Sequence, residues 1–150
     1  MKLTKIQKIL VVADHEIMGQ SIKRHLKREG FAVDISQDVS VAKDLVLAAA
    51  QAGTQFGLIL FDIKGPRYNV FTLIAWLNRD FPEIAVLVVS GFGNADLPDL
   101  LLRPEFDCFY KKPVLPREIV TAIRSIEKKK MNQAGRLEKV GKKGVMTCEC

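Results

Sequence analysis

Three short apolar runs rich in Ile, Val and Leu limit most strongly what this chain can fold into. They read KILVVA at 8–13, FGLILF at 56–61 and IAVLVV at 84–89. Runs of this kind are typical of parallel strands that are buried on both faces of a sheet. Less buried strands are predicted at 31–36 and 106–110, and the spacing of apolar residues predicts helices over 17–28, 39–52, 68–79, 98–102 and 116–128. The alternation predicts an α/β fold: a doubly wound, five-stranded parallel sheet with helices on both faces.

The size and composition of the chain favour a single globular domain. It has 150 residues, of which 48% are apolar, so it can bury a sizeable core. Its longest apolar runs have six residues, whereas a membrane-spanning helix needs about 20. The acidic residues at 14 and 16 argue against a signal peptide, and three cysteines are too few for a disulfide framework. We therefore expect a cytoplasmic protein without a membrane partner.

The net charge of +6 is distributed unevenly along the sequence. Residues 127–150 contain seven Lys or Arg residues and three Glu, so most of the excess lies near the C-terminus. We expect a folded domain over 1–127 and a basic, flexible tail over 128–150. Because the body is nearly neutral, this distribution argues against nucleic acid as a partner.

Polar residues with complementary chemistry follow four of the predicted strands. They are Asp14, Asp62, Ser90 and Lys112. The carboxyl ends of parallel strands meet at one edge of a sheet, where ligands bind in folds of this class. Two carboxylates suit Mg²⁺, and a hydroxyl with an ammonium group suits a phosphoryl group. Asp and Ser are also ordinary turn formers, so each of them could simply end its strand.

The order and spacing of these motifs resemble the receiver domain of two-component response regulators, over about residues 6–127. The matching pieces are KILVVAD, LILFDIKGP, VLVVSG and FYKKP. The resemblance implies the strand order 2-1-3-4-5. It also implies a phosphorylation-controlled switch rather than an enzyme.

Carried over to this sequence, the resemblance gives each residue of the site a role. Asp62 is expected to be the phosphoacceptor, and Asp14, Asp62 and the backbone carbonyl of Lys64 are expected to hold Mg²⁺. Ser90 and Lys112 are expected to stabilise the phosphoryl group, and Phe109 occupies the position of the switch aromatic. Plain packing in the sheet would also account for Phe109.

Two residues depart from the pattern of the family. Ala13 stands where members usually carry a second acid, which predicts weakened Mg²⁺ affinity. Lys64, two residues after Asp62, could reach over the site and shield the acyl phosphate from water, or it could be a solvated loop lysine.

The resulting expectation is a stand-alone response regulator that acts through another protein. Its phosphodonor would be a sensor histidine kinase or a phosphotransfer protein. Its output partner would bind the usual face of helix 4, strand 5 and helix 5, and a homodimer is left open. The alternative is a pseudo-receiver that serves as a constitutive interaction module. A flavodoxin-like or hydrolase-like enzyme is disfavoured, because the sequence has no GxGxxG or GxxxxGK phosphate loop.

Overall fold

The computed structural model describes residues 6–63, 68–90, 107–111 and 114–134. The strands are β1 (Lys8–Ala13), β2 (Ala32–Ser36), β3 (Leu58–Ile63), β4 (Ala85–Ser90) and β5 (Cys108–Lys111). The helices are α1 (Glu16–Arg28), α2 (Val39–Ala52), α3 (Tyr68–Asp80) and α5 (Pro116–Ala134). The helix expected at 98–102 lies outside the described residues, as do Lys64 and Lys112.

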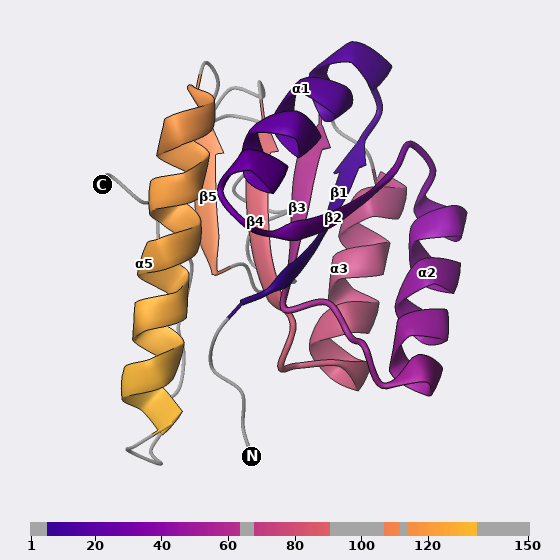
Figure 1. Ribbon diagram of the computed structural model, residues 1–150. Helices are drawn as coiled ribbons and strands as arrows, with labels where there is room; N and C mark the ends of the chain where they lie inside the picture. Colours follow the sequence, from indigo (N-terminus) through magenta and orange to yellow (C-terminus); the bar gives the residue numbers. More distant parts are fainter. Residues whose placement is uncertain (1–5, 64–67, 91–106, 112–113, 135–150) are drawn as a thin grey trace.

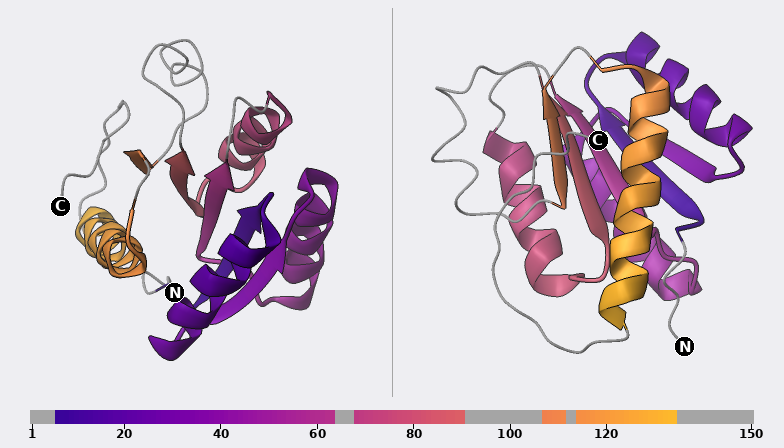
Figure 2. Two further views of the ribbon diagram at one scale, coloured as in Figure 1. Left: turned by 90° about the horizontal axis from the view of Figure 1, so that it is seen from above. Right: turned by 90° about the vertical axis from the view of Figure 1, so that its left-hand side faces the viewer.

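All five strands run parallel in one sheet of order β2-β1-β3-β4-β5, as expected. Helices α1 and α5 cover one face of this sheet, and α2 and α3 cover the other (Figures 1 and 2). The fold is therefore a doubly wound α/β sandwich, with the helices in two layers around the sheet.

The strands form because their side chains are buried on both faces of the sheet. Leu58, Ile59, Leu60 and Phe61 of β3 are all fully buried. Alternate residues of β3 pack into two separate cores. Ile59 packs into the core under α2 and α3, and Leu60 packs into the core under α1 and α5. Burial of this kind contributes about 25 cal/mol for each Å² of apolar surface, so the central strands anchor the fold.

Capping residues mark both ends of α2. Asp38 caps α2 by accepting a hydrogen bond from the Ser40 N–H at 3.1 Å. Gly53 closes the same helix with a φ of +75°, a left-handed conformation that glycine adopts without steric cost.

Several predicted boundaries were wrong by a few residues. The third strand was expected at 56–61, but β3 ends at Ile63, so Asp62 lies inside the strand. Likewise, Ser90 is the last residue of β4 and does not follow it. The pairing with neighbouring strands sets these ends, and a sequence pattern alone does not report it.

The last helix was expected to end near 128, but α5 continues to Ala134. The first residues assigned to a flexible tail are therefore helical. Contacts with the far end of the sheet support this extension: the Lys130 ammonium group donates a hydrogen bond to the Glu83 carbonyl at 3.4 Å.

Candidate functional site

The register of the sheet brings three of the predicted site residues to adjacent strand ends. Asp62 pairs with Ala13, so Asp14 lies one residue beyond it on the neighbouring strand. On the other side, Ser90 pairs with Ile63, one residue beyond Asp62. Neighbouring strands are about 4.8 Å apart, so β1, β3 and β4 present these residues side by side.

The three residues differ in their exposure to solvent. Asp62 is 4% exposed and Ser90 is fully buried, whereas Asp14 is half-buried at the end of β1. A carboxylate buried to this degree among apolar strands needs polar partners. In the described part of the chain, no buried side-chain nitrogen or oxygen lacks a hydrogen-bond partner. This edge of the sheet is thus a polar site on an apolar scaffold.

Strand β5 completes the edge next to β4. Its last residue, Lys111, pairs with Ser90, and Phe109 pairs with Val88. Lys112 follows directly in the sequence, but it lies outside the described residues, and the roles expected of Lys112 and of the Phe109 ring stay predictions.

An acid that the sequence analysis missed holds β5 in this register. The Asp107 carboxylate accepts a hydrogen bond from the Val86 N–H at 2.7 Å, and the Asp107 N–H donates to the Val86 carbonyl at 2.8 Å. This two-point contact fixes β5 against β4 before the ladder begins. The one sign of this contact in the sequence was that Asp107 directly precedes a short apolar run.

A glycine that the sequence analysis also missed brings α1 close to the site. A Cβ atom at Gly19 would lie 2.7 Å from Ile35 Cδ1 and 3.2 Å from Ala13 Cβ. Gly19 therefore lets the first turns of α1 pack directly on Ala13, the residue before Asp14. A glycine inside a predicted helix was the signal, because it costs about 1 kcal/mol relative to alanine and so calls for a packing reason.

The donor set at this edge suits Mg²⁺. Asp14 and Asp62 supply two carboxylates, and Mg²⁺ is commonly held by one or two carboxylates while it keeps several water ligands. No group of three or more His, Cys, Asp or Glu side chains suited to a metal occurs within the described ranges. Ala13, which is buried in the core beside α1, adds no side-chain ligand, because its methyl group has no donor atom.

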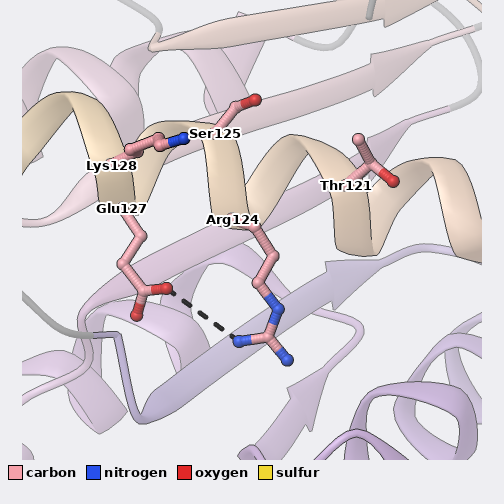
Figure 3. Close-up of a pocket in the computed structure, with 5 residues that line it drawn as sticks. All are labelled: Thr121, Arg124, Ser125, Glu127 and Lys128. Atoms are coloured by element: carbon pink, nitrogen blue, oxygen red, sulfur yellow. Dashed lines mark ion pairs between the residues drawn. The ribbon is translucent and has the colours of Figure 1, made fainter.

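A depression of about 370 Å³ lies elsewhere, on α5. Thr121, Arg124, Ser125, Glu127 and Lys128 line it (Figure 3). These residues belong to the part of the helix that runs away from the strand ends, so the depression is separate from the site.

Comparison with known proteins agrees with this geometry. The model of the response regulator receiver domain matches residues 9–124. The chain belongs to this family. Receiver domains are signalling domains of two-component systems, and they generally bind Mg²⁺ at the phosphorylation site.

Curated relatives include transcriptional regulators. The chain is 25% identical to the transcriptional regulatory protein AruR of Pseudomonas aeruginosa over 125 residues, which cover 83% of this chain and 50% of that protein. It is 29% identical to the transcriptional regulatory protein CpxR of Escherichia coli over 121 residues, covering 81% of this chain and 49% of that protein. The chain thus spans about half the length of the curated relatives it matches.

Solved receiver structures superpose on most of the chain. A CheY-like receiver domain protein from Methanospirillum hungatei is 26% identical, with a TM-score of 0.72 over 86% of this chain and 99% of that one. A receiver domain from Clostridium thermocellum, 21% identical, has the same fold, with a TM-score of 0.71 over 85% of this chain and 98% of that one. No helix in the described ranges is long and apolar enough to span a membrane.

Proposed function

We propose that this receiver accepts a phosphoryl group on Asp62 and thereby changes its affinity for a partner protein. The observation that supports the proposal most directly is the placement of Asp62 in β3. Its carboxylate is buried at the strand end, flanked by Asp14 on one side and Ser90 on the other. Family membership supports the class of reaction, and this placement supports Asp62 as the residue that accepts the phosphoryl group.

The proposed donor is a phosphohistidine of a sensor histidine kinase or of a phosphotransfer protein. One Asp62 carboxylate oxygen attacks the phosphorus as the bond from phosphorus to the imidazole nitrogen breaks, and the electron pair of that bond returns to the donor histidine. The product is an aspartyl phosphate, an acid anhydride that water later cleaves to restore the carboxylate.

The surrounding residues stabilise the charge of the phosphoryl group in this proposal. The Ser90 hydroxyl donates a hydrogen bond to one of its oxygens, and the Lys112 ammonium group pairs with another. Asp14, Asp62 and the Lys64 carbonyl would hold Mg²⁺, which supplies positive charge that offsets the repulsion between carboxylate and phosphoryl group. The burial of Asp62 strengthens each of these interactions, because solvent screens them less.

The output of the switch is proposed to be a change in protein binding rather than catalysis. Ser90 ends β4, next to the strand that carries Asp62. Its hydroxyl is proposed to move toward a phosphorylated Asp62. The Phe109 ring is proposed to turn inward in response, which would alter the surface at β5 and α5. On the sequence grounds given above, we propose that this exchange takes place in the cytoplasm.

Incubation with Mg²⁺ and acetyl phosphate tests the proposal. Intact-protein mass spectrometry should show the addition of one phosphoryl group, which alkaline hydroxylamine should remove as it does other acyl phosphates. Asp62→Asn is the matched control, since it keeps the shape of the side chain and removes the nucleophile. If the wild-type chain gained no phosphoryl group, and beryllofluoride caused no spectral change, the protein would be a constitutive interaction module instead.

The role proposed for Lys64 has its own test. If its ammonium group shields the acyl phosphate from water, Lys64→Asn should shorten the lifetime of the phosphorylated form, measured as the decay of radiolabelled protein. An unchanged lifetime would mean that Lys64 is a solvated loop lysine.

A further inference from the structure

The charge of the described helices is segregated onto one face of the sheet. Helix α1 carries four Lys or Arg residues and one Glu. Helix α5 carries five Lys or Arg residues and two Glu. By contrast, α2 and α3 each carry one basic and one acidic residue, so their charges cancel. Because α1 and α5 share a face (Figures 1 and 2), the layer that they form is strongly basic.

The positive charge gathers at the end of this layer that lies far from Asp62. Both helices start near the carboxyl ends of the strands and run back toward the amino ends, as crossover helices do. The last two turns of α1 therefore lie at this end, where the end of α1 is beside the middle of α5: Arg124 of α5 contacts Glu29, the residue that follows α1. We call their exposed basic residues the distal basic face: Arg24, Lys27, Arg28, Arg124 and Lys128.

Arg124 joins the two helices at the centre of this face. Its guanidinium group lies 5.0 Å from the centroid of the Phe31 ring and contacts the Glu29 carboxylate at 3.8 Å. It also lies 3.9 Å from the Glu127 carboxylate (Figure 3). The contacts with Phe31 and Glu29 link α5 to the end of α1, so the basic residues of the two helices lie on one continuous surface.

The other basic side chains of the face have no ion-pair partner within the described ranges. No carboxylate of the described residues forms an ion pair with Arg24, Lys27, Arg28 or Lys128. Like charges gathered on one surface repel one another, and a bound polyanion would relieve that repulsion.

The face lacks the apolar anchors that a protein partner would use. The large apolar side chains exposed in the described ranges are Ile17, Met18, Val41, Leu47 and Leu115, and none of them lies at this end of α1 or α5. The nearest aromatic ring, that of Phe31, is buried beneath Arg124, so it offers no surface for stacking unpaired bases. The cores of protein interfaces are apolar and aromatic, whereas contacts to duplex backbones are made by Arg and Lys.

We propose that the distal basic face binds the phosphate backbone of double-stranded nucleic acid, without sequence preference. This inference departs from the sequence expectation, which treated the body as nearly neutral. The linear count was correct, but it could not show that the charges of two distant segments share one surface. The inference does not depend on phosphorylation of Asp62, because the face lies at the other end of the helices.

A titration of a fluorescein-labelled DNA duplex of mixed sequence with the full, unphosphorylated chain tests the proposal by fluorescence anisotropy. Binding is expected at low salt, and the logarithm of the affinity should fall linearly with the logarithm of salt concentration. Arg28→Gln with Lys128→Gln should reduce the affinity about tenfold and lower the salt slope by about two, one for each lost phosphate contact.

The matched control removes two basic residues from the opposite layer. Lys43→Gln with Arg79→Gln causes the same change in net charge on α2 and α3, and it should leave the affinity within about twofold of the wild type. Residues 135–150 are the same in both variants and therefore cannot account for a difference between them. Thermal unfolding of each variant checks that the fold is intact.

Three results would overturn the proposal. The first is an absence of duplex binding at low salt, and the second is an equal loss of affinity in both double variants, which would reveal an effect of net charge alone. The third is binding to vesicles of phosphatidylglycerol that is much tighter than binding to the duplex and is lost in the Arg28→Gln, Lys128→Gln variant, which would assign the face to a membrane surface. Phosphotransfer to Asp62 is measured separately, so none of these results bears on the proposed switch.

Discussion

Glu127 links Ile6, just before β1, to α5, and its removal should destabilise the protein measurably. This acid is 8% exposed, and its Oε2 accepts a hydrogen bond from the buried Ile6 N–H at 2.7 Å. Ile6 itself packs into the core beneath α1 and α5. Glu127→Ala leaves that N–H without its carboxylate partner in a site with little room for water.

The magnitude follows from three contributions. An unsatisfied buried N–H costs about 1–3 kcal/mol. The contact with Arg124 adds little, because that side chain is 47% exposed and such pairs contribute about 0–1 kcal/mol. The higher helix propensity of alanine stabilises α5 by a few tenths of a kcal/mol, which offsets a small part of this loss. We expect a net loss of about 2 kcal/mol, which corresponds to about 8 °C in melting temperature for a domain of this size.

Urea unfolding followed by circular dichroism measures this loss, and Glu127→Gln is the matched control. Glutamine keeps an oxygen acceptor for the Ile6 N–H and loses only the charge, so its cost should stay below about 1 kcal/mol. If the two variants lost equal stability, the hydrogen bond to Ile6 would not be the cause. A loss below about 0.5 kcal/mol for Glu127→Ala would refute the reasoning altogether.

Three further predictions concern the site and its supports. Gly19→Val should lower the free energy of unfolding by about 1–3 kcal/mol in urea titrations, because its side chain would overlap Ile35 and Ala13, whereas a stable variant would show that α1 can shift freely. Asp107→Ala should cost about 1–2 kcal/mol in the same assay, because the Val86 N–H loses its partner, and Asp107→Asn should recover part of the loss. Ser90→Ala should slow phosphorylation by acetyl phosphate at least about tenfold without abolishing it, and an unchanged rate would remove Ser90 from the proposed site.

Much of the fold could be predicted from local patterns. The strand at 8–13 and the helix at 39–52 were predicted with the observed bounds, because continuous apolar runs and helical spacing reflect burial directly. Asp14, Asp62 and Ser90 could be selected because the ends of parallel strands must share an edge. The pattern of apolar residues was less informative where hydrogen bonding to a neighbouring strand sets the end of a strand. Strand β3, for example, ends two residues later than predicted.

Other features depend on contacts between distant segments, and no local pattern reports them. Gly19 matters only because Ile35 and Ala13 approach it, and Asp107 matters only because Val86 lies opposite. The continuation of α5 to Ala134 is another such case, since contacts such as that of Lys130 with the Glu83 carbonyl help to hold it.

The sequence by itself determined the alternation of strands and helices, and with it the α/β class and the polar residues at the strand ends. These properties arise from the periodicity of burial along a short stretch of chain. The strand order was expected from the resemblance to a known family, whereas only the tertiary structure decided the register between neighbouring strands and that α1 and α5 place their positive charge on one face. The physical reason is that hydrogen bonds between strands, and the electrostatic field of neighbouring charges, act through space. They therefore join residues that can be far apart in sequence.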